Sequence, residues 1–260
     1  MFIDILFLSL LQAITEFFPV SSSGHLILFH KFLSSNVLLD NISFDVVLHG
    51  GSLLAIIIFF YKDIESILKT FFSDIKNKSL KNNLALIIFV TILPAGLVGY
   101  FFEDFIDSIR DPRIVVFALI FGAILFLIAE KYFKQKKYIS NITFLDGIFI
   151  GLLQCLSFIP GVSRSGITIF AGMGRGLGKI DAARFSFIMA IPLLLGAFIK
   201  KITDISSTDN YYVLFLGFIL TALFSFFAIK FLMNILSKLG LKVFAYYRII
   251  LAIIIIIFFL

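Results

Sequence analysis

Glu16 and Gln12 are spaced so that they could do chemistry together inside an otherwise apolar stretch. They stand four residues apart, so on a helix both side chains project from one face. A carboxylate there could hold Mg²⁺ or Ca²⁺, with the amide oxygen of Gln12 and water completing the shell, or it could act as a general base. The alternative is a glutamate that reaches water or caps a neighbouring helix. We take Glu16 and Gln12 as candidate metal ligands.

A polar cluster follows Glu16 after one helical turn. Ser21, Ser22, Ser23 and Gly24 supply hydroxyls and exposed amides at the start of a second predicted helix, a position suited to binding phosphate. His25 lies three residues after Ser22 and can share its helical face. Ser22 is therefore a candidate nucleophile, and His25 a candidate proton carrier. The alternative is a helix cap beside a packed histidine.

Arg164 is the ionisable group of a second polar cluster. Its planar guanidinium can bind phosphate oxygens in a bidentate manner. An unpaired arginine at membrane depth would be costly, so we expect its partner to be an anionic ligand or Glu16. A purely structural ion pair between Arg164 and Glu16 is the alternative. The predicted companions of Arg164 in phosphate binding are Ser163, Ser165, Gly166 and Thr168.

The two clusters are copies of one pattern. Residues 12–24 read QAITEFFPVSSSG and residues 154–166 read QCLSFIPGVSRSG, and Asp4 and Asp146 match at the same offset. We interpret this as an internal duplication within a single membrane domain of residues 1–260. Its first repeat covers about 1–132 and its second about 144–260.

The composition places the chain in lipid. Of 260 residues, 60% are hydrophobic and only 15% are charged, more apolar surface than a water-soluble fold of this size buries. The net charge of +6 suits anionic lipid head groups, and nucleic acid is not expected as a partner. Cys155 is the only cysteine, so neither an intrachain disulfide nor a cysteine metal cluster can form.

The apolar runs predict an all-α polytopic membrane protein with six transmembrane helices and two re-entrant helix–loop–helix hairpins. The hairpins are 1–34 and 144–175, because each is broken in the middle by a polar cluster and its halves are too short to span a bilayer. The predicted spans are 43–61, 84–102, 113–132, 183–199, 211–233 and 243–260.

Positive charge predicts the orientation. The lysine-rich loops 62–83 and 131–143 should be cytoplasmic, and the acidic loop 103–112 should lie outside. Three spans separate the hairpins, so the first enters from the outside and the second from the cytoplasm. The two repeats are therefore predicted to be inverted, an arrangement in which broken helices meet and form a site near the midplane.

Two further features are weaker. Asp45 and His49, four residues apart, could serve the same site or form a solvated pair. Arg248 stands about one turn into the last predicted span. We expect its guanidinium to extend to the membrane interface.

These motifs resemble those of the undecaprenyl pyrophosphate phosphatase family, the bacitracin-resistance phosphatases. The family's (Glu or Gln)xxxGlu motif is matched by Gln12 to Glu16, with Gln in first place, which leaves Glu16 as the only carboxylate of that pair. Further matches cover nearly the whole chain: PVSSxGH at 19–25, FDVVLHGG at 44–51, PGxSRSG at 160–166, RFSF at 184–187 and YR at 247–248.

The resemblance implies a hydrolase of the bacterial inner membrane that converts undecaprenyl pyrophosphate to undecaprenyl phosphate and phosphate, recycling the lipid carrier for cell-wall synthesis. It also implies a divalent metal, a site open to the outer side, and bacitracin as a competitor that binds the substrate. A homodimer is left open. The rival hypothesis is a transporter or flippase of a lipid phosphate, because inverted hairpin repeats are also a transporter architecture.

Overall fold

The computed structural model describes residues 2–22, 24–25, 42–102, 109, 111–134, 136–205 and 210–260. Ser23 and the second half of the first predicted hairpin lie outside these residues, as does most of the 103–112 loop. The described chain is helical and contains no β-strand. Its α-helices are α1 (Phe2–Phe17), α3 (Ile42–Phe59), α4 (Tyr61–Lys76), α5 (Leu84–Phe101), α7 (Pro112–Tyr132), α8 (Phe144–Gln154), α9 (Arg164–Gly174), α10 (Lys179–Lys201), α11 (Tyr211–Lys238) and α12 (Lys242–Phe259).

The long helices lie close to the predicted spans, and together they make a multi-pass membrane protein. Four of them, α5, α7, α10 and α11, are long and apolar enough to cross a membrane, and α3 with α4 counts as a fifth span if the bent pair is taken as one. The sixth predicted span is occupied by α12. Polar caps fix several helix starts: Asn83 accepts hydrogen bonds from the N–H groups of Ala85 and Leu86, and Asp111 accepts one from Arg113.

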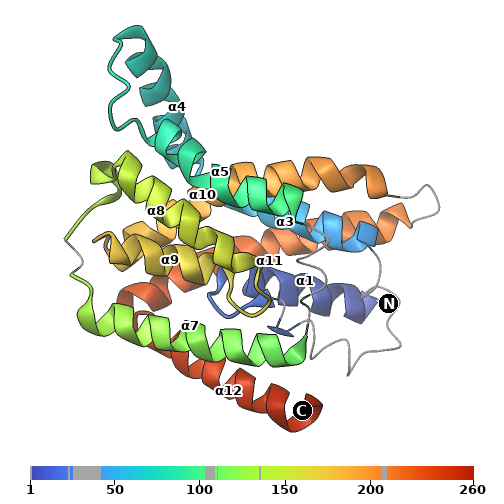
Figure 1. The fold of residues 1–260 in the computed structure, drawn as a ribbon. Coiled ribbons are helices and arrows are strands. Elements are labelled where there is room, and N and C mark those ends of the chain that lie inside the picture. Colours follow the sequence, from blue (N-terminus) through green and yellow to red (C-terminus); the bar gives the residue numbers. More distant parts are fainter. Residues whose placement is uncertain are drawn as a thin grey trace.

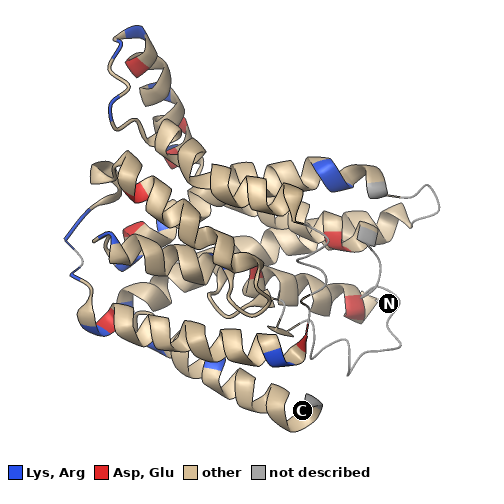
Figure 2. Cartoon of the chain, viewed as in Figure 1, with Lys and Arg blue, Asp and Glu red and all other residues tan. Residues whose placement is uncertain are grey.

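The predicted loop 62–83 is wrong over most of its length, because it contains α4. An amphipathic pattern of lysines and apolar residues was interpreted as a charged loop, although such a pattern also fits a surface helix. Figure 2 shows that Lys and Arg gather at the end of the bundle where α4 and the 132–143 connection lie. We call this the basic end.

The second hairpin has the predicted helix–loop–helix form. It runs through α8, the short 3₁₀-helix η2 (Cys155–Phe158), an irregular turn and α9. A capping box begins α8, in which Thr143 and Asp146 satisfy each other's backbone N–H groups. Asp146 is buried and also accepts hydrogen bonds from Lys137 and Arg175. This carboxylate therefore ties the start of α8 to Lys137 before it and to Arg175 after α9.

The helices α1 and α8, which precede the two polar turns, pack in related ways (Figure 1). The first half of hairpin one, α1, packs on α11, and the first half of hairpin two, α8, packs on α5. In addition, α3 contacts α10, and α7 contacts α12. Buried apolar side chains from α1, α3, α7, α9, α10 and α11 share one core, so the polar ends of the hairpins face each other inside the bundle.

Candidate active site

The two polar turns share an unusual backbone conformation. Ser21 and Ser163 have φ angles of 71° and 72°, in the left-handed region that residues other than glycine rarely adopt. In each turn the serine hydroxyl accepts a 3.3 Å hydrogen bond from the N–H of the glycine three residues later, Gly24 or Gly166. The serines thus hold their turns in the same capped form. Such strained residues concentrate at functional sites.

Glu16 and Arg164 form an ion pair that joins the two hairpins. Nη2 of Arg164, at the start of α9, donates to Oε1 of Glu16, near the end of α1, over 2.5 Å. The side chain of Glu16 is 9% exposed and that of Arg164 is 20% exposed. Each charge stabilises the other in these poorly hydrated surroundings, and removal of one would leave the other uncompensated. The guanidinium keeps further N–H groups on Nη1 and Nε that could bind an anion.

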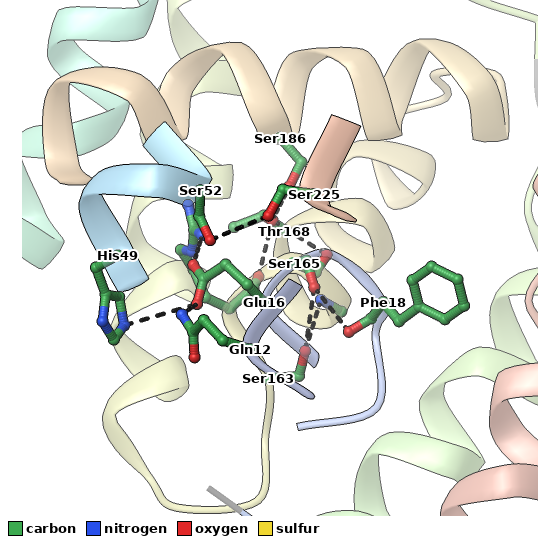
Figure 3. Close-up of polar contacts among 12 residues, drawn as sticks. Gln12, Glu16, Phe18, His49, Ser52, Ser163, Ser165, Thr168, Ser186 and Ser225 are labelled. Carbon is green, nitrogen blue, oxygen red and sulfur yellow. Dashed lines mark hydrogen bonds and ion pairs between the residues drawn. The ribbon is translucent and has the colours of Figure 1, made fainter. Parts of the chain in front are cut away.

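Gln12 and His49 contact the second oxygen of Glu16, as Figure 3 shows. The amide nitrogen of Gln12 donates to Oε2 over 3.3 Å, and Nε2 of His49 lies 3.8 Å from the same oxygen. Nδ1 of His49 donates to the carbonyl of Asp45 over 2.9 Å, so a protonated ring presents its second N–H to the carboxylate. Asp45 and His49 were both candidates for this site, and the structure places the side chain of His49 beside Glu16.

The hydroxyls of α9 lie beside and behind Arg164. The Oγ atoms of Ser163 and Ser165 are 3.2 Å apart, and Ser165 donates to the carbonyl of Phe18 over 3.4 Å. Thr168 is buried, and its hydroxyl contacts that of Ser186 on α10 over 2.6 Å (Figure 3). Ser163 and Gly166 therefore shape the N-terminus of α9. Thr168 lies one turn further in and ties α9 to α10.

His25 is held in a defined tautomer. Its Nδ1 lies 2.7 Å from the carbonyl oxygen of Ser21, which can only accept, so Nδ1 carries the proton. A neutral ring then accepts at Nε2 from the Tyr247 hydroxyl, 2.6 Å away. The ring is 6% exposed and stacks on Tyr247. Nδ1 thus contacts Ser21 and Nε2 contacts Tyr247, so both ring nitrogens of His25 already have partners. Ser22, the candidate nucleophile, is partly exposed.

The expectation that Arg248 extends to the interface is wrong. Arg248 is fully buried, because α12 packs on α7 with this position inward. Its Nη2 donates to the carbonyls of Gly161 and Val162, in the irregular turn just before Ser163. Backbone without helical hydrogen bonds is costly at membrane depth, so a buried donor that satisfies it holds the turn in place. Gly122 leaves room for the guanidinium, which a Cβ there would overlap.

We expect Arg248→Met to lower both thermal stability and activity. Methionine keeps much of the volume but removes the hydrogen bonds that Arg248 donates to the carbonyls of Gly161 and Val162, at a cost of about 0.5–1.5 kcal/mol for each lost bond. The measurement is thermal unfolding in detergent followed by circular dichroism, together with turnover. Lys242→Met, an exposed substitution in the same helix, is the matched control. Equal unfolding temperatures for the two variants would contradict this role of Arg248.

The donors at the site fit a metal shared with a phosphate ligand better than a metal held by protein alone. The described residues contain no cluster of three or more His, Cys, Asp or Glu side chains placed to hold an ion. Glu16 contributes a carboxylate and Gln12 an amide. Mg²⁺ is commonly bound by one or two carboxylates plus substrate phosphates, so this small set is sufficient only with an anionic ligand present.

Comparisons with known proteins identify the family of this chain. The family model described as "Bacitracin resistance protein BacA" matches residues 5–254. The chain is 40% identical to the undecaprenyl-diphosphatase of Thermodesulfovibrio yellowstonii over 253 residues, covering 95% of this chain and 93% of the relative. It is 38% identical to the undecaprenyl-diphosphatase of Halothermothrix orenii, with 97% and 96% covered, and 37% identical to that of Rubrobacter xylanophilus, with 94% and 93% covered. The chain therefore belongs to the BacA family.

Proposed function

We propose that this chain is an undecaprenyl-diphosphatase, which hydrolyses undecaprenyl pyrophosphate to undecaprenyl phosphate and phosphate. In this role it would return the lipid carrier to cell-wall synthesis and confer bacitracin resistance. The observation that carries the proposal is the Glu16–Arg164 pair, which places a carboxylate and a phosphate-binding guanidinium together inside a membrane protein. The relatives named undecaprenyl-diphosphatase support the substrate.

The second hairpin binds the pyrophosphate in this proposal. Arg164 neutralises the charge on the phosphoryl oxygens, and backbone N–H groups at the N-terminus of α9 add a favourable dipole. Ser163, Ser165 and Gly166 border this position. Because Thr168 is buried against Ser186, its contribution is to fix α9 and hence Arg164. Ser21 and Gly24 of the first polar turn would bind the same phosphate, and the role predicted for Ser23 falls outside the described residues.

The first hairpin supplies the groups that move the proton and attack phosphorus. Ser22 or a water molecule attacks the terminal phosphorus and gives its proton to a base, while the bond to the bridging oxygen breaks so that undecaprenyl phosphate leaves. If Ser22 is the nucleophile, water then hydrolyses the phosphoserine and releases phosphate. Glu16, with His49 beside it, is the nearest general base to Arg164. His25 could assist Ser22 only after Nε2 exchanges its hydrogen bond from Tyr247 for one from the serine hydroxyl.

A divalent metal, Mg²⁺ or Ca²⁺, would be held by Glu16 and Gln12 together with oxygens of the pyrophosphate. When bound, such an ion supplies charge neutralisation at the phosphoryl oxygens. Glu16 already contacts Arg164 and Gln12 through different oxygens, so the carboxylate is orientated for binding.

We further infer that six spans and two re-entrant hairpins form inverted repeats in the bacterial inner membrane, with the site facing the outer side. Support comes from the paired packing of α1 on α11 and α8 on α5, and from the shared turn conformation at Ser21 and Ser163. The basic end would face the cytoplasm. Bacitracin would then compete by binding the substrate on the outer side.

An apolar groove between α5 and α10 agrees with a lipid substrate. It has a volume of about 450 Å³, and its apolar lining includes Leu93, Gly96 and Leu193. Phe158 of η2 also lines it, so the groove reaches the hairpin that carries Arg164. A prenyl chain could therefore lie beside the site.

The test is phosphate release from undecaprenyl pyrophosphate by the purified protein in detergent micelles, with Mg²⁺, with Ca²⁺ or with a chelator. We expect release that stops on chelation and returns with the metal. A lipid-phosphate transporter, the alternative, needs two compartments and would release nothing in micelles. Absence of release under every condition would overturn the proposal, and release unaffected by chelation would overturn the metal.

A further inference from the structure

Helix α4 is set apart from the rest of the bundle. The connection between α3 and α5 contains a helix, α4. The connection at the matching place in the second half of the chain, between α10 and α11, consists of residues 202–210 and contains no α-helix among its described residues. None of the residues of α4 is fully buried. The helix bends by 71° away from α3 and projects from the bundle, as Figure 1 shows. It therefore contributes little to the core and runs across the direction of the spans.

One face of α4 is apolar; its Ile64 and Ile67 pack against the core, and no described element covers the rest of it. On a helical wheel its apolar residues share one side, because they recur every three or four positions. The most exposed of them are Phe72 at 66%, Tyr61 at 56% and Leu68 at 49%. The full face consists of Tyr61, Ile64, Ile67, Leu68, Phe71, Phe72 and Ile75. In water this face would be costly to expose.

The charges of α4 are sorted between its two edges. The carboxylates of the edge next to Ile67 contact protein: Asp63 pairs with Arg184 of α10 over 2.5 Å, and Asp74 accepts from Asn83 over 2.7 Å. The opposite edge carries a row of exposed lysines seven residues apart, in which Glu65 is the one acidic neighbour. These are Lys62, Lys69 and Lys76.

We propose that α4 lies in the lipid–water interface at the basic end of the bundle and binds anionic phospholipids. Its apolar face would enter the boundary between head groups and acyl chains, and Lys62, Lys69 and Lys76 would contact the lipid phosphates. Amphipathic helices with basic edges bind anionic membranes in this way. The membrane is favoured over a second protein copy, because the helix runs across the spans at the basic end and its lysines complement lipid charge.

The chain contains no tryptophan, so the fluorescence of a single introduced tryptophan reports on one position alone. A Phe72→Trp variant in nanodiscs reports on the apolar face, and Ser66→Trp, at an exposed position on the polar face, is its matched control. With phospholipids brominated near the top of the acyl chain, we expect the Phe72→Trp emission to shift to shorter wavelength and to be quenched. Emission from Ser66→Trp should instead be quenched by aqueous iodide.

The charge requirement is tested in the same variant by adding Lys62→Gln, Lys69→Gln and Lys76→Gln. In nanodiscs containing phosphatidylglycerol the three changes should reduce quenching by brominated lipid, whereas in pure phosphatidylcholine they should have little effect. Three results would overturn the proposal. The first is quenching of the Phe72→Trp emission by iodide. The second is a blue shift without quenching by brominated lipid, which indicates a protein partner. The third is an equal effect of the lysine changes in both lipids.

Discussion

Arg164→Lys is expected to lower kcat/KM for phosphate release about 10²–10³-fold, the loss typical of removing one well-placed donor to a developing negative charge. Lysine keeps a positive charge that can still pair with Glu16, but it lacks the planar fork that binds two phosphate oxygens at once. Since Arg164 already contacts Glu16 through Nη2, the loss should come from the N–H groups that remain for the ligand. The measurement is steady-state phosphate release in micelles with saturating metal.

Two controls separate this effect from a loss of structure. Arg113→Lys changes an exposed arginine at the start of α7 and should leave turnover unchanged. The unfolding temperature of Arg164→Lys should stay near that of the unsubstituted protein, because the ion pair with Glu16 can reform. If Arg164→Lys retained full activity, the guanidinium would be a structural partner of Glu16 alone.

Glu16→Gln is expected to lower kcat about 10²–10⁴-fold, the range associated with loss of a general acid or base. Glutamine keeps the volume and can still accept a hydrogen bond from Arg164, but it leaves the charge of Arg164 uncompensated, so the unfolding temperature is measured beside turnover and should fall. What disappears is the negative charge that could take a proton or bind a metal. Turnover is measured across a metal titration, because a lost metal ligand shifts the titration and a lost base lowers the plateau.

Ser22→Ala is the informative comparison for Glu16→Gln. A covalent serine nucleophile predicts that Ser22→Ala abolishes turnover, and the enzyme trapped during turnover should carry phosphate on Ser22. If Ser22→Ala retained most activity while Glu16→Gln lost it, water would be the nucleophile. Full activity of Glu16→Gln would contradict every role assigned to this carboxylate.

The two copies of the polar pattern differ in the residues that carry charge. At the offset that aligns the polar clusters, Phe158 stands where the first copy has Glu16, and Arg164 stands where the first copy has Ser22. Each hairpin therefore carries one charge of the pair and lacks the other. Both copies keep the same turn conformation, at Ser21 and Ser163. The turn geometry is therefore common to the two copies, whereas the two charges are divided between them.

Local pattern was sufficient for much of the architecture. The ends of α5 and α7 lie within a residue of the predicted spans, because a helix in lipid must satisfy its own backbone and needs a fixed apolar length. The helix–loop–helix form of 144–175 was predicted from its broken apolar run. Glu16 was one of two partners expected for Arg164, the other being an anionic ligand, since an intramembrane charge requires a counter-charge. The one local error, at α4, arose because lysines at helical spacing were interpreted as a loop.

The sequence by itself thus determined the apolar helices, the duplicated polar turns and the charges that must find partners. Only the tertiary structure decided which partners they found. Arg248 is buried because α12 turns it toward the second hairpin, His49 reaches Glu16 because α3 packs near α1, and Tyr247 meets His25 across the bundle. These contacts join segments far apart in the chain, and helical periodicity fixes the face of a residue on its own helix but not the neighbour that this face will meet.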